Sequence, residues 1–497
     1  MKRIVSLCLI TVMLLTAMPL VASALVVGEW EIEISNGEAY IIGFNGMCPD
    51  TMTLPTQIGN FPVAGLKSNI FTENVTEIII PEGYSNISIS NSYGKNLSNL
   101  KDSLIKITLP STLVEFDVSF NGFSKLTEIN IPSGVKVIPD EQFMRCVNLK
   151  KVVLHDGLEK IGHSAFYGCY NLLEIKIPNT VKEIRYWAFR ECHSLKNIVI
   201  PNSVEILNEA ITFCNNLETV VLSDNITKLS SRGGFEMGEL ANCPKLSSVY
   251  IGKNVVAFQN SPGAYVGVMG GSESLKTIII PEGVVSIGSC AFKNNNNLEA
   301  VVLPKSFSKI ELNLVKSKPF CDGEKQPLPK LYLYGYKGTY AETFANEGGF
   351  PFVDISVATP TNSKVLVDGK EVAFTAYNIG GNNYFKLRDI AAAINDTNKN
   401  FNVGWDGNNN AITLNSKTAY AQVGGELVIN ANAVVTEPKI SNPKIFVDGK
   451  LTTFMAFNIE DSNYIKLRDL GEVFDFNINW NDKTQIIEIN TNKSYVK

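Results

Sequence analysis

The chain has 497 residues and a formal net charge of −5 at pH 7, from 49 acidic and 44 basic side chains. This mild acidity gives the protein no electrostatic reason to bind nucleic acid, and the length predicts two to four domains or one long repeat array. Only three histidines are present, and they are too scattered for a zinc or copper site. We therefore expect no metal and no cofactor.

The first 24 residues have the pattern of a secretory signal peptide. Lys2 and Arg3 precede an apolar run over residues 4–20, and residues 22–24 read Ala-Ser-Ala, an A-x-A cleavage sequence. A membrane-spanning helix needs about 20 apolar residues and lacks such a site. We predict that residues 1–24 are removed on secretion, which changes the formal charge to −7, and no later apolar run is long enough to span a bilayer.

A unit of about 23 residues recurs between residues 67 and 330. It reads L-x-x-I-x-I-P-x-x-V-x-x-I-x-x-x-A-F-x-x-C-x-N-L. Its I-x-I run alternates as a strand with one buried face does, and the proline ends the strand because it has no N–H for a ladder. One coil cannot bury its own apolar face, so we predict a stack of roughly ten coils, about 50 Å long, with a parallel sheet.

Cysteine recurs three residues before the repeat leucine in five coils, and other coils hold Phe123 or Asn295 in the same slot. A small side chain buried against the backbone of a turn explains this series, because buried cysteine behaves as a small hydrophobe. Parallel side chains do not converge, so we expect mostly free thiols. His193 lies in a variable surface position beside one of them and does not indicate a catalytic pair. The predicted ladder is Cys146, Cys169, Cys192, Cys214 and Cys243.

Aromatic residues occupy variable positions in adjacent coils. Together they could form a surface patch for a protein or a sugar, or they could be scattered surface residues that need no explanation. These candidate contact residues are Tyr167, Tyr170, Tyr186 and Trp187.

Three insertions lengthen the array, over residues 82–103, 229–242 and 254–274. Insertions in solenoids emerge on one face and often form the contact surface. The third carries Tyr265 and Met269 among glycines. We expect both side chains to be exposed in a ligand-binding bulge, with sequence drift at a tolerant loop as the alternative.

The repeat resembles the BspA-type leucine-rich repeats of bacterial surface proteins, on its A-F-x-x-C-x-x-L and I-P-x-x-V-x-x-I words. Residues 25–66, with Asn36-Gly37 as a hairpin turn, resemble the N-terminal cap and first repeat of such arrays. Residues 331–357, where a tyrosine-rich strand leads into an amphipathic helix, resemble the C-terminal cap. The resemblance implies a leucine-rich repeat solenoid that binds or adheres and does not catalyse.

A second self-similarity begins after the array. Residues 358–363 read as a short linker rich in proline, serine and threonine. A pattern that contains the word V-D-G-K then begins at Lys364 and begins again at Lys444, 80 residues later. Each copy reads as a hairpin with an Asp-Gly turn, a helix and a closing hairpin, with the helices over 387–394 and 467–474. Residues 364–497 are therefore predicted to be a small duplicated α+β domain.

This duplicated unit resembles the N-terminal stalk domain of copper amine oxidases. The resemblance does not extend to oxidase activity, because Gly380 and Phe385 stand where the cofactor motif needs threonine and an acid, and the tail has no histidine. The word K-L-R-D recurs at 386–389 and 466–469. Its cations could contact wall phosphates or acidic glycans, or its arginines could pair with nearby carboxylates at the helix start.

The sequence thus predicts a repeat solenoid followed by an α+β stalk domain, in a secreted bacterial protein retained at the envelope. We expect it to bind an extracellular protein or glycan without catalysis, and to contact the cell wall through residues 364–497. One alternative is a self-associating structural envelope protein. The other is a wall hydrolase, which would need paired carboxylates in a cleft, and no G-x-S-x-G, H-E-x-x-H or Walker motif is found.

Overall fold

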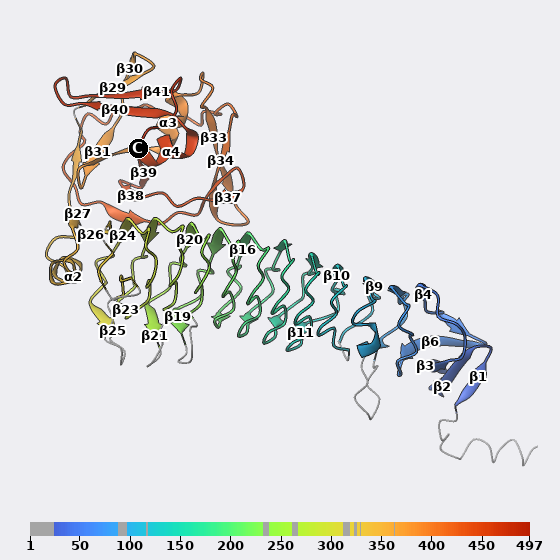
Figure 1. Cartoon of the computed structure of the whole chain (residues 1–497). Coiled ribbons are helices and arrows are strands. Elements are labelled where there is room, and N and C mark those ends of the chain that lie inside the picture. Colours follow the sequence, from blue (N-terminus) through green and yellow to red (C-terminus); the bar gives the residue numbers. More distant parts are fainter. Residues whose placement is uncertain are drawn as a thin grey trace, which may run out of the picture.

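The protein is an elongated solenoid with a second unit seated on one side of its C-terminal part (Figure 1). The predicted signal peptide lies almost entirely outside the described residues, as does Tyr265. The computed structural model describes residues 24–87, 97–115, 118–231, 238–260, 267–311, 319–322, 326–328, 330–361 and 363–497.

The N-terminal end is closed by an antiparallel hairpin that joins the stack. Strands β2 (Trp30–Ser35) and β3 (Glu38–Phe44) meet at Asn36 and Gly37, whose φ angles of 53° and 82° make the predicted tight turn. The hairpin edge is extended by β1 (Leu25–Val27). On the other side, β3 pairs in parallel with β6 (Phe61–Leu66), so the hairpin passes directly into the repeats.

The I-x-I runs form the predicted parallel ladder, which we call the front sheet. The central residue of each strand lies opposite the residue at the equivalent position of the next coil, as in Ile129 opposite Val152 and Val152 opposite Ile175. The ladder is hydrogen-bonded in three segments. Its strands are β4 (Thr51–Thr53), β7 (Glu77–Ile79), β9 (Lys106–Thr108), β10 (Glu128–Asn130), β12 (Lys151–Val153), β14 (Glu174–Ile175), β16 (Asn197–Val199), β18 (Thr219–Val221), β20 (Ser248–Tyr250), β22 (Thr277–Ile279), β24 (Ala300–Val302), β26 (Tyr332–Gly335) and β27 (Phe352–Asp354).

A second parallel ladder, the back sheet, was not predicted. It forms where the V-x-x-I segment crosses behind the coil, and its residues also pair coil to coil, as in Ile138 opposite Ile161. Its strands are β11 (Val137–Ile138), β13 (Lys160–Ile161), β15 (Glu183–Ile184), β17 (Ile206–Leu207), β19 (Lys228–Ser231), β21 (Ala257–Asn260), β23 (Ser286–Gly288) and β25 (Lys309–Glu311). Short elements also lie near the N-terminal end, namely β5 (Gln57–Ile58), β8 (Asn86–Ile87) and the 3-10 helix η1 (Leu97–Leu100).

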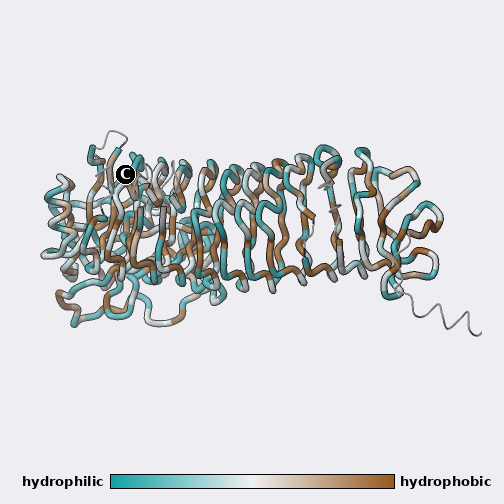
Figure 2. Tube along the Cα trace, turned by 90° about the horizontal axis from the view of Figure 1, so that it is seen from below, coloured by the Kyte–Doolittle hydropathy of each residue, from teal (hydrophilic) through white to brown (hydrophobic). Residues whose placement is uncertain are grey.

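The core between the two sheets is a column of repeated side chains. Phe120, Phe143, Phe166 and Phe189 stack with ring centroids 5.5–5.6 Å apart and nearly parallel planes. Figure 2 shows apolar positions recurring from coil to coil along the solenoid. Because each coil places the same side chain over its neighbour, the core is continuous along the array.

The last coil is covered by the helix that the sequence predicted. Helix α2 (Tyr340–Gly348) buries Ala341, Phe344 and Ala345 on one face. It ends at Gly349, whose positive φ of 73° lets its N–H close the helix on the carbonyls of Ala345 and Asn346. Within the described residues, no helix is both long enough and apolar enough to cross a lipid bilayer.

The tail is one domain in which the two copies exchange strands. A central sheet runs β28-β31-β32-β39-β38-β35, and its two copies meet where β32 pairs antiparallel with β39. Each flanking sheet takes strands from both copies, in the orders β30-β29-β41-β40 and β33-β34-β36-β37. Helices α3 and α4 begin and end within one residue of the predicted positions. The duplication therefore builds a single intertwined domain.

The first copy consists of β29 (Lys364–Val367), β30 (Lys370–Val372), β31 (Ala376–Ile379), β32 (Asn382–Lys386), α3 (Leu387–Ala393), β33 (Phe401–Asp406) and β34 (Ala411–Ser416). The second consists of β36 (Ile445–Val447), β37 (Lys450–Leu451), β38 (Ala456–Ile459), β39 (Ser462–Lys466), α4 (Leu467–Phe474), β40 (Asn477–Asn481) and β41 (Ile486–Asn490). Each copy thus has one hairpin more than the sequence predicted, between the first hairpin and the helix.

The segment 358–363, predicted to be a linker, contributes to this fold. Residues Ala358–Pro360 form β28, the edge strand of the central sheet, beside β31. Ala358 is fully buried and exchanges backbone hydrogen bonds with Thr436, just before β35 (Lys439–Ser441). The linker prediction is therefore wrong for residues 358–360, because an alanine and a threonine next to proline also suit an edge strand.

Candidate functional site

The tail covers the C-terminal part of the front sheet (Figure 1). Side chains alternate across its central sheet, so Tyr377 and Ile379 face the solenoid while Ala376 packs toward the tail's own core. The solenoid supplies the outward residues of its strands to the same cluster, including Ile279 and Val302. Two sheets thus pack face to face, and the tail is held by an apolar core shared with the solenoid.

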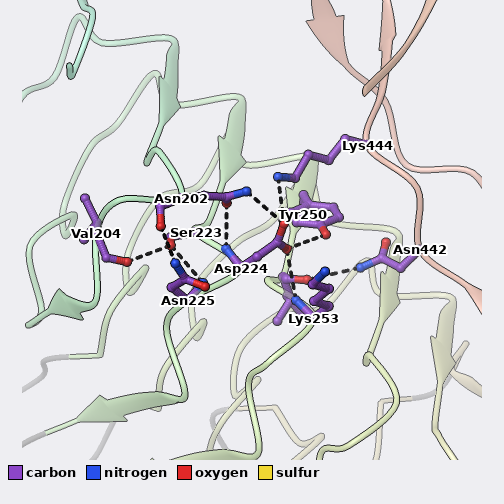
Figure 3. A network of polar contacts seen from close by, with 10 residues as sticks. Asn202, Val204, Ser223, Asp224, Asn225, Tyr250, Lys253, Asn442 and Lys444 are labelled. Carbon is purple, nitrogen blue, oxygen red and sulfur yellow. Dashed lines mark hydrogen bonds and ion pairs between the residues drawn. The ribbon is translucent and has the colours of Figure 1, made fainter. Parts of the chain in front are cut away.

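A buried ion pair lies at the edge of this interface (Figure 3). Lys444 Nζ lies 3.3 Å from Asp224 Oδ2, and the two side chains are only 5% and 6% exposed. Asp224 also accepts hydrogen bonds from the Tyr250 hydroxyl at 2.7 Å, the Asn202 amide at 3.1 Å and the Lys253 backbone N–H at 3.2 Å. The carboxylate is therefore fully engaged.

These contacts determine the charge state of Asp224. Burial alone would raise the pKa of its carboxyl, but the hydrogen bond from Tyr250 and the charge of Lys444 hold that pKa below its usual value. Burial and the hydrogen bond to Asp224 raise the pKa of the Tyr250 hydroxyl. The Lys444 ammonium also lies 4.6 Å from the centre of the Tyr250 ring. The Asp224 carboxyl thus remains ionised at neutral pH.

Among the residues that the structure describes, four further lysine–carboxylate pairs cross the interface at its rim. They are exposed to solvent, and such pairs contribute about 0–1 kcal/mol each. The pairs are Lys450–Glu218 at 2.5 Å, Lys276–Glu472 at 3.2 Å, Lys497–Glu299 at 3.0 Å, and Lys305–Glu437.

The front sheet is uncovered from β9 to β14 and borders the tail at β16, where Val199 lines a cavity with Asn409 and Phe446 of the tail. We call the surface from β9 to β16 the open face. Each central strand residue is buried and its two neighbours point outward, as Glu128 and Asn130 do on either side of Ile129. The outward residues of the open face are Lys106, Thr108, Glu128, Asn130, Lys151, Val153, Glu174, Asn197 and Val199, of which only Val153 is half-buried.

The predicted aromatic patch lies on the turns that follow the back sheet, and part of it forms a compact cluster. The Arg190 guanidinium lies 5.8 Å from the Tyr167 ring centre and 5.4 Å from that of Trp187. Tyr170 lies one turn away, exposed, and stacks on His193 at 5.0 Å. Tyr186 is half-buried. The structure therefore brings Tyr167 and Trp187 together around a cation that the sequence analysis did not single out.

The prediction that Met269 is exposed is wrong. Met269 is fully buried, and its N–H donates to the Ala291 carbonyl of the next coil at 2.8 Å. Gly267, two residues earlier, is required by close packing, because a Cβ there would lie 2.1 Å from the Cys290 carbonyl oxygen. Residues 267–269 thus continue the coil.

The five predicted ladder cysteines are fully buried and free. In the first four, the thiol donates to a phenylalanine carbonyl of the preceding coil, at 3.0–3.4 Å. Asn295 fills the same slot and donates to the Met269 carbonyl at 2.9 Å. Burial raises the pKa of Cys146 to about 12, so this thiol is unreactive. The slot supplies a hydrogen-bond donor to an orphan carbonyl, which explains why cysteine and asparagine share it.

The histidines do not form a metal site in the described part of the chain, where no three His, Cys, Asp or Glu side chains gather closely enough to hold an ion. His155 hydrogen-bonds to Asn130 at 2.7 Å, and His163 packs 5.3 Å from the Trp187 ring.

The tail carries two cavities on its own surface, away from the solenoid. One, of about 420 Å³, lies beside Trp405 and the other, of about 360 Å³, lies beside Trp480. Arg388 lines the first and Arg468 the second. Within the described residues, neither arginine forms an ion pair with a carboxylate, so the interpretation that they pair at the helix start is wrong.

The aspartates that follow these arginines accept hydrogen bonds from backbone N–H groups. Asp389 accepts from the Leu427 N–H and Asp469 from the Met455 N–H, both at 3.0 Å. Burial raises the pKa of Asp469 to about 6. In the K-L-R-D word the acid is thus structural, while the arginine is left for solvent or ligand.

A family model described as a BspA type Leucine rich repeat region matches six copies, over residues 53–151, 136–263 and 267–319. These ranges together span more than half of the chain. The chain belongs to the BspA-type leucine-rich repeat family. The matched residues of this BspA-type protein end before its C-terminal cap and tail. The family match therefore says nothing about the tail, which is described from its structure alone.

Solved structures also resemble this BspA-type chain. A leucine rich cell surface protein from Faecalibacterium prausnitzii is 21% identical and aligns over 58% of this chain and 94% of its own, with a TM-score of 0.28. A leucine-rich repeat protein from Bacteroides ovatus is 22% identical over 66% and 98%, with a TM-score of 0.34. The leucine rich repeat protein of T. pallidum is 20% identical over 50% and 90%, with a TM-score of 0.24. These scores are low, so family membership rests on the repeat itself. No curated protein matches the chain.

Proposed function

We propose that this protein is a secreted bacterial binding protein that acts at the cell surface and contacts an extracellular protein or glycan through the open face of its solenoid. The observation that carries the proposal is the stretch of front sheet that the tail leaves open, from β9 to the edge of the tail at β16, whose outward side chains are mostly charged or polar. Secretion is supported by the signal-peptide pattern of residues 1–24.

The binding role is proposed to be non-catalytic. An extended sheet offers area and shape, and such surfaces gain affinity from a few central side chains surrounded by polar contacts. Tyr167, Trp187 and Arg190 are of the residue types that contribute most at interfaces. They are proposed as a second contact region, on the turns that follow the back sheet.

The tail is proposed to keep the protein at the cell wall, and it resembles the stalk domain of copper amine oxidases in its duplicated V-D-G-K and K-L-R-D words. The tail packs on the front sheet through a buried interface and is therefore a fixed part of the molecule. Its role should be tested in the full chain. Cosedimentation of residues 25–497 with purified bacterial cell wall measures retention directly. Full recovery in the supernatant would contradict this part of the proposal.

The binding role is tested on arrays of glycans and of purified extracellular proteins. A variant with Glu128→Lys, Lys151→Glu and Glu174→Lys reverses charge on the open face, and we expect it not to bind the array ligands that the native residues 25–497 bind. The matched control reverses exposed charges on the back sheet side, with Lys136→Glu and Glu159→Lys, and should still bind those ligands. Binding that survives the first variant would contradict the open face as the contact. A stable homo-oligomer without array binding would favour a structural envelope protein.

A further inference from the structure

The two cavities of the tail are the same site, built twice. Lys386 and Arg388 of the first correspond to Lys466 and Arg468 of the second, 80 residues later. The lining residues Val403, Trp405 and Ile412 correspond to Ile478, Trp480 and Ile487, each 75 residues later. An internal duplication has therefore preserved one cavity with a cation pair, an indole and an apolar floor.

Each cavity is completed by the other copy. Strands β32 and β39 run antiparallel, so the Lys-Leu-Arg end of one lies beside the turn that begins the other. Accordingly, Ser462 and Asn463 line the Trp405 cavity, and the corresponding Asn382 and Asn383 line the Trp480 cavity. The site exists only because the two copies share one sheet.

The side chains of the site suit a sugar ring. Trp405 is 62% exposed and Trp480 is 38% exposed, which is unusual for an indole unless its flat apolar face has a partner. A pyranose presents an apolar C–H face to such a ring and hydroxyl groups at its edge. Asparagine and glutamine amides supply both donors and acceptors for those hydroxyls. The remaining polar residues of the Trp480 cavity are Thr361, Ser363, Asn378, Asn382, Asn383, Asn479 and Gln485.

The two cavities differ in charge. The Trp405 cavity is lined by three carboxylates, of Asp389, Glu426 and Asp461, beside its two cations. The described lining of the Trp480 cavity has no carboxylate, so Lys466 and Arg468 are not neutralised within it. Asp482 lies outside this lining, where it accepts from the Trp480 indole N–H at 2.6 Å. A guanidinium and an ammonium in such a cavity favour an anionic group, which the guanidinium can bind through two parallel hydrogen bonds.

We propose that the Trp480 cavity binds an anionic sugar unit of an acidic polysaccharide, with the sugar ring on the Trp480 indole and its acidic group on Arg468 and Lys466. The Trp405 cavity has the corresponding indole and cations but does not select a sugar that carries an acidic group. This inference deepens the proposed wall retention by naming a ligand class, and it is independent of the solenoid's binding role.

The test uses isothermal titration of residues 25–497 with trigalacturonic acid, whose sugars carry carboxylates, and with a phosphorylated mannan fragment, whose sugars carry phosphates. We expect one or both to bind, with affinity falling as salt rises, and the stronger ligand identifies the acidic group. Galactotriose, which is neutral, should bind at least about tenfold more weakly. Binding of neither acidic glycan would overturn the proposal, whatever the outcome of cosedimentation with cell wall.

The duplication provides matched controls for the residues. Arg468→Gln should weaken acidic-glycan binding by about tenfold or more, and Trp480→Ala should abolish it, whereas Arg388→Gln and Trp405→Ala should leave it within about twofold. All four side chains are exposed, so the variants should melt with the native chain, and Arg468→Gln suffices if Trp480→Ala unfolds. Equal losses in both cavities, or equally tight binding of poly-glutamate, would show that the Trp480 cavity does not select an acidic sugar.

Discussion

The open and the covered parts of the front sheet share one backbone and differ in their outward side chains. In the open part the central residue of each strand is flanked by residues such as Glu128 and Lys151. In the covered part, strands β18, β20 and β24 are buried at all three positions, and their outward residues are small or apolar, such as Thr219 and Val302. The repeat thus specifies the solenoid, while the two outward slots decide which strands accept the tail.

The largest loss of stability is expected from placing a charge at an outward strand position that the tail covers. Val302 is 1% exposed and packs in the core shared with the tail, so Val302→Lys buries an unpaired ammonium. The cost should be about 4–5 kcal/mol in unfolding free energy, or undocking of the tail. Thr108 occupies the same strand position in β9 and is exposed, so Thr108→Lys should cost less than about 0.5 kcal/mol. Chemical denaturation of both variants checks the contrast, and equal costs would contradict the buried interface.

The next effect concerns the buried ion pair. Lys444→Ala leaves the Asp224 carboxylate buried without its cation, and removing one partner of such a pair costs about 3–5 kcal/mol. Hydrogen exchange should rise at β18, β20 and the tail's facing strands while remaining unchanged at β10 and β12. Replacing both partners, with Lys444→Met and Asp224→Asn, should recover part of the loss. A cost below about 1 kcal/mol for the single variant would show that the pair does not hold the tail.

Much of the solenoid is predictable because its signal is local and repeated. The 23-residue period, the alternation around Ile129 and the Asn36-Gly37 turn each specify short-range geometry. The cysteine slot was also predicted as buried, although its hydrogen bond to the preceding coil was not. The back sheet was missed because its strands, two to four residues long, follow a V-x-x-I spacing that does not alternate as a strand does.

Docking of the tail was missed although the sequence contains its signal. The outward strand positions lose their charges from Asn197 onward, and the tail strands read AYNI and AFNI, apolar on both faces. Such strands are buried on both sides, and they could have indicated a partner sheet. The sugar cavity was out of reach because β32 and β39 come from different copies, and their adjacency is a matter of topology.

A pH-dependent difference is expected between the two parts of the array. Glu239 lies buried in a covered coil, at the slot that holds Ala165 and Ala188 in open ones, and accepts from the N–H groups of Glu209 and Ala210. Burial raises the pKa of this carboxyl from 4.5 to about 7. Between these values the folded state retains a proton that the unfolded state releases, so stability should fall as pH rises, by about 3 kcal/mol in total.

Glu239→Gln should remove this slope, because an amide does not titrate. Denaturant unfolding at several pH values between 4.5 and 8 compares the variant with the native chain. Parallel profiles would mean that Glu239 does not titrate across this window.

A smaller loss of stability is expected from substitutions in the cysteine ladder, which lies beneath both the open and the covered parts of the front sheet. Cys192→Ser keeps a donor for the Phe166 carbonyl but buries a more polar group, so it should cost about 1–2 kcal/mol. All five ladder thiols are buried and should resist a thiol reagent at pH 8 until the chain unfolds, and burial also raises the pKa of Cys146 and Cys192. Rapid labelling of Cys214 or Cys243 in the folded protein would show that the covered coils open more readily than the interface implies.

The smallest effect should come from the exposed pairs at the rim of the interface. Lys450→Ala removes the partner of Glu218, and because both groups contact water the loss should stay below about 1 kcal/mol. At 1 M salt the screening length falls to about 3 Å, so all four rim pairs weaken together. The tail should nevertheless stay docked, as small-angle scattering would record, since the shared apolar core and the Lys444–Asp224 pair are shielded from solvent. Extension of the molecule at high salt would instead assign the docking to surface charge, and would make the covered face available as a second binding surface.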